Sequence, residues 1–123
     1  MLFRSLDLAW AAENWQESRN QKLPFRYNRN GHQEIIARGN IPFIAALHGA
    51  TLGGGLETAS AAHIRVADET TFFGLPEGTR GIYIGGGGSV RIARLLGFSR
   101  MQDMMLTGRV LRPEEAEIGR AHV

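Results

Sequence analysis

The sequence has 123 residues, of which 14 are basic and 12 acidic, and it contains no cysteine. This length suits one domain with a real core, and the balanced charge argues against a disordered or nucleic-acid-binding chain. Without cysteine, disulfide scaffolds, cysteine nucleophiles and thiolate metal sites are excluded. No stretch is typical of a transmembrane helix or signal peptide, so we expect a soluble, cytoplasmic protein that binds neither nucleic acid nor membrane.

Helices and strands alternate along the chain, which predicts an α/β fold. In chain order we expect a helix at Leu8–Arg19 and a polar loop at Asn20–Asn30. A short helix at Gly31–Arg38 and a buried strand at Ile41–Leu47 come next. A helix follows at Leu56–Ala62, then a second buried strand at Ile64–Ala67 and a short extended piece at Phe72-Phe73. Three more helices are predicted. The first spans Ser89–Leu96, and the second begins with a capping box at Ser99–Gln102 and ends at Gly108. The third begins at Pro113.

Glycine is the compositional outlier, with 16 residues of 123. Two clusters stand out, Gly53–Gly55 and Gly85–Gly88. The first cluster follows a predicted strand and opens a predicted helix, where backbone N–H groups are unpaired and the helix dipole is positive. Because glycine has no side chain to keep a ligand away, the N–H of Gly54 is suited to stabilise a developing oxyanion.

Two glutamates accompany these glycines. Glu57 lies one turn into the predicted helix, and Glu77 follows Pro76 after a strand that should run alongside the first. Two carboxyl groups flanking one cavity can act as acid and base on one water molecule. Glutamates in a first helical turn or after a proline are also commonly structural, and spacing alone favours that interpretation.

Other catalytic motifs are missing from the sequence. It has no dinucleotide fingerprint, no P-loop, no zinc-binding H-E-x-x-H and no G-x-S-x-G elbow. The four histidines do not have the mutual spacing of metal ligands, so we predict no metal site.

Five segments, in order and in spacing, resemble the signature of the enoyl-CoA hydratase/isomerase (crotonase) superfamily. They are residues 41–57 (IPFIAALHGATLGGGLE), Ile64–Ala67, Phe73–Glu77, Gly85–Gly88 and Leu106–Arg109. Leu6-Asp7-Leu8 is similar to the end of a further family segment. The resemblance implies a crotonase-like ββα-superhelix core, truncated at both ends, whose parent protein processes acyl-CoA thioesters and usually forms trimers or hexamers.

The resemblance also implies a set of site residues. The backbone N–H groups of Leu6 and Gly54 match the family's oxyanion hole, and Glu57 and Glu77 match its two catalytic glutamates. The presence of both glutamates favours a lyase that hydrates a 2-enoyl-CoA to a 3-hydroxyacyl-CoA. No metal or separate redox cofactor is implied, since coenzyme A is part of the substrate. Further substrate-binding positions implied by the family pattern are Asp7, Leu8, Leu52, Gly53, Pro76 and Gly85.

Three alternatives stay open: another crotonase reaction such as isomerisation or dehydration, a binding module without catalysis, and an inactive fragment. His48 and His63 depart from the common family residues, and we expect packing or hydrogen-bonding roles for both at element junctions. Tyr83 and Ile84 also depart from the family, and we expect them to reshape the acyl pocket.

Both ends of the chain depart from the family pattern. Met1–Ser5 and Ile118–Val123 match translations of common sequencing-adapter DNA, so we predict that residues 6–117 are the native, partial crotonase domain. This chain would then lack sheet strands and part of its oxyanion hole. We expect it to be poorly soluble and inactive, whereas its parent gene would encode an active enzyme.

Overall fold

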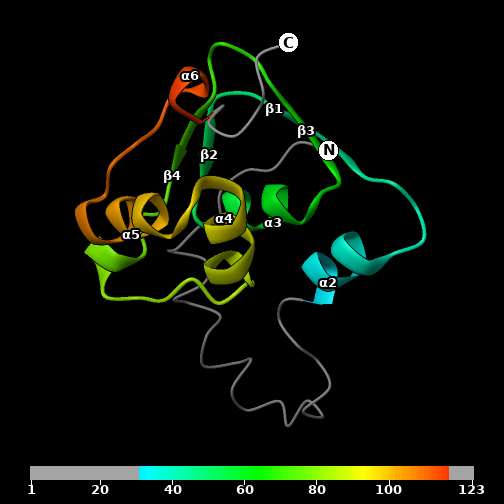
Figure 1. Cartoon of the computed structure of the whole chain (residues 1–123), viewed down its shortest axis with the longest axis horizontal. Helices are drawn as coiled ribbons and strands as arrows, with labels where there is room; N and C mark the ends of the chain where they lie inside the picture. The colour runs from blue at the N-terminus through cyan, green and yellow to red at the C-terminus, as the bar shows by residue number, and fades with distance from the viewer. Residues whose placement is uncertain (1–30, 117–123) are drawn as a thin grey trace, which may run out of the picture.

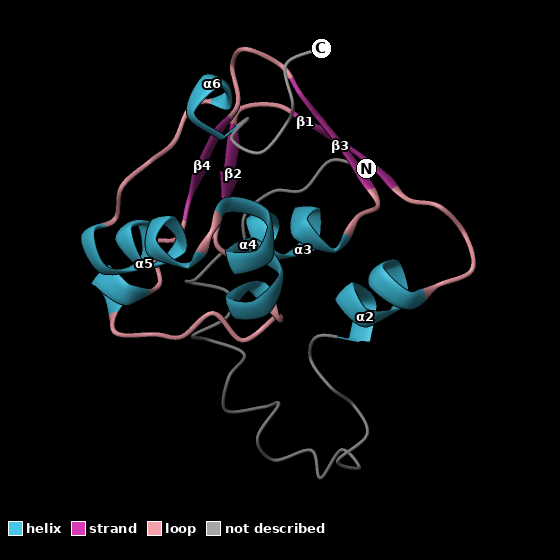
Figure 2. Cartoon of the chain, in the orientation of Figure 1, coloured by secondary structure: helices cyan, strands magenta, loops and turns pink. Residues whose placement is uncertain are grey.

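The computed structural model describes residues 31–116. The helix predicted at Leu8–Arg19, the loop at Asn20–Asn30, and the site residues Leu6, Asp7 and Leu8 lie outside this range, as does the tail Ile118–Val123. The described elements, shown in Figures 1 and 2, are α2 (Gly31–Arg38), β1 (Ile44–Leu47), β2 (Ala50–Leu52), α3 (Gly54–Ala61), β3 (Ile64–Ala67), β4 (Phe72–Gly74), the 3-10 helix η1 (Gly78–Arg80), α4 (Gly88–Leu96), α5 (Phe98–Thr107) and α6 (Pro113–Ala116). The predicted α/β class is confirmed.

Two parallel strand pairs form the sheet part of the fold. β1 pairs with β3 and β2 pairs with β4, so the strand that follows α3 does run alongside the first strand, as predicted. The sequence pattern missed β2, which follows β1 after a turn at Gly49 with a positive φ of 59°. In the view of Figure 2 both strand pairs lie above α3, α4 and α5.

The strands are less buried than their apolar sequences predict. β1 begins at Ile44 rather than Ile41, and its burial alternates, with only Ala45 and Leu47 buried. β3 has no buried residue, and Val66 is 59% exposed. An apolar parallel strand is normally covered on both faces, but among the described residues only one face of β1 is buried and neither face of β3 is.

The helix α3 is central to the core, and all its residues from Leu56 to Ala61 are buried. Its two hydroxyl groups are satisfied within the helix: Oγ1 of Thr58 donates to the carbonyl of Gly54 at 2.8 Å, and Oγ of Ser60 donates to the carbonyl of Glu57 at 2.6 Å. Small side chains with satisfied hydroxyls let neighbouring helices approach closely without burying unpaired polar groups.

The predicted capping box of α5 is wrong. The helix begins at Phe98, and its N-cap is Gly97, with no side-chain capping bond. Ser99 therefore lies inside the helix, where its hydroxyl cannot act as the N-cap. The predicted end is confirmed, because Gly108 closes the helix in the left-handed region with φ 74°. Met101 and Met104 of this helix are buried in the core.

Candidate active site

The beginning of α3 is an open helix N-terminus. Gly53 turns the chain with φ 51°, and its N–H donates to the carbonyl of Gly74 at 3.0 Å, which extends the β2–β4 ladder. Gly54 is exposed, and a Cβ placed on it or on Gly55 would meet no atom within 4 Å. An N–H group in a first helical turn has no partner within the helix. The backbone of Gly54 is therefore accessible, as its predicted oxyanion role requires, and that role stays a prediction.

Glu57 is buried and held by the second glycine cluster. The exposed fraction of the residue is 6%, and its Oε1 accepts hydrogen bonds from the backbone N–H of Gly86 at 2.6 Å and of Gly88 at 3.0 Å. A Cβ on Gly86 would lie 2.9 Å from Oε2 of Glu57, and one on Gly88 would lie 2.8 Å from its Cγ. These glycines thus allow the loop to close around the carboxylate.

Glu77 is buried in a different way. It precedes η1, and its backbone carbonyl accepts from the N–H groups of Arg80 and Ile82, both at 3.0 Å. The residue is 7% exposed, and its Oε2 has no hydrogen-bond partner among the described residues. A Cβ on Gly53 would lie 2.5 Å from Oε1 of Glu77, so the absence of a side chain at Gly53 lets this carboxyl approach the start of α3.

The environment of Glu77 favours its protonated form. Burial raises the pKa of its carboxyl above the ordinary value, and the nearby charge of Glu57 raises it further. The backbone N–H of Glu77 and the charge of Arg80 oppose this shift without reversing it. One carboxyl group thus has two backbone donors, whereas the other is desolvated, and such unequal pairs are suited to divide acid and base roles.

The structure therefore brings Gly53, Glu57 and Glu77 together near the start of α3. Of the other predicted site residues, Leu52 and Pro76 are half-buried and flank this region in sequence, while Gly85 is exposed in the glycine loop. Among residues 31–116 no cluster of His, Asp and Glu side chains could hold a metal ion. No described helix has both the length and the apolar composition to cross a membrane.

The two histidines and the Tyr83-Ile84 pair, which depart from the family pattern, differ in burial and in contacts. His63 accepts a hydrogen bond from the backbone N–H of Phe43 at 3.1 Å and stacks on its ring, the junction role expected for it. His48 is exposed and lines a small hollow with Leu47, Thr51 and Gly55. Ile84 is 1% exposed within the core cluster, and Tyr83 is 71% exposed. Ile84 therefore acts in packing here.

Sequence reasoning missed the residues that support Glu57. Gly86 and Gly88 donate to its carboxylate, and Arg91 in turn donates to the carbonyl of Gly86 at 2.7 Å. The signal was available for the glycines, because successive glycine N–H groups form concave anion-binding backbones. For Arg91 no sequence signal existed, since an arginine on an amphipathic helix is ordinarily a solvated residue.

Most of the chain matches a known protein family. Residues 7–119 match the sequence model of the family Enoyl-CoA hydratase/isomerase. The fatty acid oxidation complex subunit alpha of Shewanella amazonensis is 51% identical over 93 residues, which are 72% of this chain and 13% of that protein. This chain thus spans a small part of the curated relatives that it matches.

Solved structures of the same family have a similar fold. The enoyl-CoA hydratase of Thermoplasma volcanium superposes with a TM-score of 0.68 at 32% identity, covering 91% of this chain and 41% of that one. The enoyl-CoA hydratase of Bacillus anthracis gives a TM-score of 0.68 at 38% identity, covering 72% of this chain and 34% of that one. The chain belongs to the enoyl-CoA hydratase/isomerase family and contains part of its crotonase fold.

Proposed function

We propose that the complete protein containing these residues is a lyase of fatty acid metabolism that adds water to a 2-enoyl-CoA, giving a 3-hydroxyacyl-CoA. The family match and the similarity to a fatty acid oxidation subunit support an acyl-CoA substrate. We further propose a cytoplasmic homotrimer or hexamer that needs no metal or redox cofactor, because coenzyme A is part of the substrate.

In the proposed mechanism Glu57 and Glu77 hold one water molecule between them. The water oxygen bonds to the β-carbon of the enoyl group while one carboxylate accepts a water proton. The electron pair of the carbon–carbon double bond moves toward the thioester, and the resulting enolate oxygen is stabilised by the N–H of Gly54 and by a second backbone N–H, assigned to Leu6. The protonated carboxyl then delivers a proton to the α-carbon, so atoms and charge balance.

The unequal pair of buried carboxyl groups is the observation that carries this proposal. Glu57 has its Oε1 bound by two N–H groups, whereas Oε2 of Glu77 is buried without a partner among the described residues. A buried polar atom without a partner is costly, and catalytic sites are where such costs are found. A substrate or water hydrogen bond to Oε2 would remove that cost.

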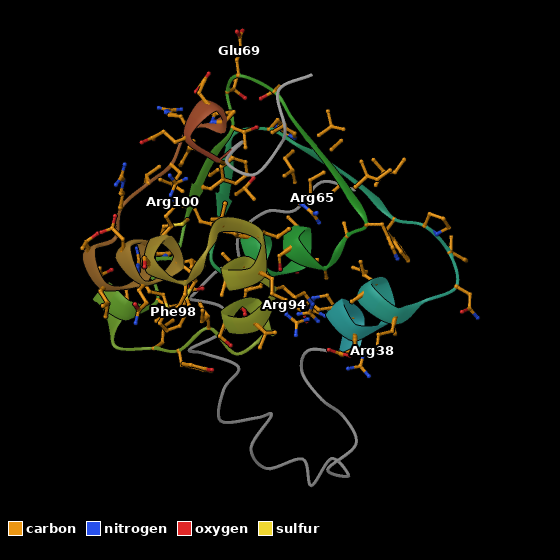
Figure 3. The ribbon with its side chains drawn as sticks, viewed as in Figure 1. Arg38, Arg65, Glu69, Arg94, Phe98 and Arg100 are labelled. Carbon is orange, nitrogen blue, oxygen red and sulfur yellow. The ribbon has the colours of Figure 1, made fainter. Side chains whose placement is uncertain are left out.

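The test uses the complete protein encoded by the source gene and measures the turnover of crotonyl-CoA. Glu57→Gln and Glu77→Gln should each lower kcat by about 10²–10⁴-fold, the usual contribution of a general acid or base. Glu69→Gln is the matched control, because Glu69 is an exposed carboxylate on the loop between β3 and β4, at the top of Figure 3.

The pattern of losses separates hydration from the alternatives. Loss of turnover in both glutamine variants supports hydration. Loss in only one variant would favour an isomerase or other crotonase reaction, which fits the family's other named activity. If the wild-type protein binds no acyl-CoA and retains a protein partner, the enzymatic proposal is wrong and a binding module is the better description.

A further inference from the structure

Arg91 joins the glycine loop to the helix α2. Its Nη1 donates to the carbonyl of Gly86 at 2.7 Å, and its Nη2 donates to Oε1 of Glu34 at 3.0 Å. The side chain of Arg91 is 16% exposed, so the arginine of this ion pair is largely buried. A partly buried guanidinium bound at two points is held more firmly than an exposed arginine.

The two backbone polar groups of Gly86 connect Arg91 to the candidate active site. The carbonyl of Gly86 accepts from Arg91, while the N–H of Gly86 donates to Glu57 at 2.6 Å. Gly87 makes the arrangement possible: it has φ 86°, and a Cβ on it would overlap Nη1 of Arg91. The loop is therefore held on one side by the catalytic carboxylate and on the other by the guanidinium.

The helix α2 supplies the anchor for Arg91. Glu34 on α2 forms the ion pair, and Gln33 beside it is 4% exposed and donates to Oγ1 of Thr58 on α3 at 3.4 Å. A Cβ on Gly86 would lie 2.9 Å from Nε2 of Gln33. Figure 1 shows α2 on one side of α3 and α4. Residues distant in sequence from both glutamates thus contact the loop that holds Glu57.

We propose that Arg91, anchored by Glu34, is a positioning residue that fixes the backbone of Gly86 so that its N–H points at Oε1 of Glu57. This inference rests on the proposed function, because it gives the ion pair a role in aligning the carboxylate with substrate. Arg91 contacts neither Glu57 nor the open start of α3 in any described bond. Its effect is exerted through Gly86.

The test compares Arg91→Met, Arg91→Lys and the control Arg94→Met in the complete protein. Arg94 lies on the same helix, is exposed and is labelled in Figure 3. Arg91→Met should lower kcat for crotonyl-CoA by about 10–100-fold, the effect of a small misplacement, with KM changed less than threefold. Arg91→Lys should recover part of the loss, since an ammonium can donate to the carbonyl of Gly86 but cannot bridge to Glu34 equally well. Arg94→Met should change neither constant.

A second readout does not depend on activity. In amide hydrogen exchange, peptides spanning residues 85–88 should exchange about tenfold faster in Arg91→Met, the effect of losing one charge-assisted hydrogen bond. They should be unchanged in Arg94→Met. If the wild-type protein shows no turnover, the proposed function fails while the exchange data still test the positioning.

Two results would overturn the positioning role. One is unchanged exchange at residues 85–88 in Arg91→Met. The other is faster exchange spread evenly over the protein, with kcat lower only in proportion to the folded fraction, which would make the arginine a general stabilising residue. Two results together would support the positioning role. Amide exchange should be faster only near residues 85–88 in Arg91→Met, and kcat should fall more than KM changes, with part of the loss recovered in Arg91→Lys.

Discussion

Oε1 of Glu57 and the backbone nitrogen of Gly86 are 2.6 Å apart, although 29 residues separate them in the sequence. This contact joins the two glycine clusters: one opens the helix that carries the glutamate, and the other supplies donors to its carboxylate. It also makes Gly86 a position where a single methyl group would act directly on the candidate catalytic group.

Gly86→Ala should impair the reaction more than it impairs folding. The added Cβ would lie 2.9 Å from Oε2 of Glu57 and from Nε2 of Gln33, so the carboxylate or the loop must move. We expect kcat to fall by about 10–100-fold, as for a misplaced catalytic group. Steady-state kinetics on the complete protein measure this. Glu69→Gln is the control, since Glu69 is an exposed residue on the loop between β3 and β4, and equal kinetics for both variants would contradict the prediction.

The stability contributed by Glu77 should depend on pH. Because the folded-state pKa is raised above 4.5, the folded protein retains a proton that the unfolded chain has already released. Stability therefore falls as pH rises from about 4.5 through the folded-state pKa. Glu77→Gln removes this titration, so its free energy of unfolding should increase relative to wild type as pH rises.

Urea denaturation of the complete protein between about pH 4.5 and 7.5 measures this difference. The exposed-residue variant Glu69→Gln should follow the wild-type curve at every pH. A constant offset between Glu77→Gln and wild type across that range would show that Glu77 titrates alike in the folded and unfolded states.

Gly78→Ala should loosen the packing that positions Glu77. A Cβ on Gly78 would overlap the backbone carbonyl of Met105 in α5, and a backbone atom cannot move aside as a flexible side chain can. Overpacking of this kind costs about 1–3 kcal/mol. Thermal or urea unfolding of the complete protein measures the loss. By contrast, Gly55→Ala should be neutral or stabilising by up to about 1 kcal/mol, because it adds a better helix former in open space. A neutral Gly78→Ala would mean that α5 is free to shift.

The exposed apolar face of β3 should lower the solubility of the 123-residue chain. Ile64 and Val66 of β3 are 51% and 59% exposed, and such apolar faces and edges promote association. Ile64→Lys combined with Val66→Lys should raise the soluble fraction of this chain, measured by sedimentation and light scattering after expression. Arg38→Lys, which keeps charge at an exposed position (Figure 3), should leave it unchanged. If the double variant is equally insoluble, this face is not the cause.

The local elements of the fold were accessible from the sequence. The helix Gly31–Arg38 has the predicted bounds, and α3 begins at the glycine cluster. The helix α4 ends at Leu96 and α5 is closed by Gly108, as expected. These features depend on side-chain periodicity and on glycine conformation, which are properties of neighbouring residues. The burial of β1 and β3 was predicted incorrectly because burial depends on what covers a strand, and an apolar run does not contain that information.

The sequence by itself determined the residue types of the site: an open glycine helix start, two glutamates 20 residues apart, and a second glycine cluster. Only the tertiary structure decided that the second cluster holds Glu57, that Glu77 is desolvated beside Gly53, and that Arg91 reaches both Gly86 and Glu34. Hydrogen bonds across 29 or 57 residues and the burial of a carboxyl group arise when distant segments pack together. Their geometry and their effect on pKa therefore follow from the folded neighbourhood of each group rather than from its place in the chain.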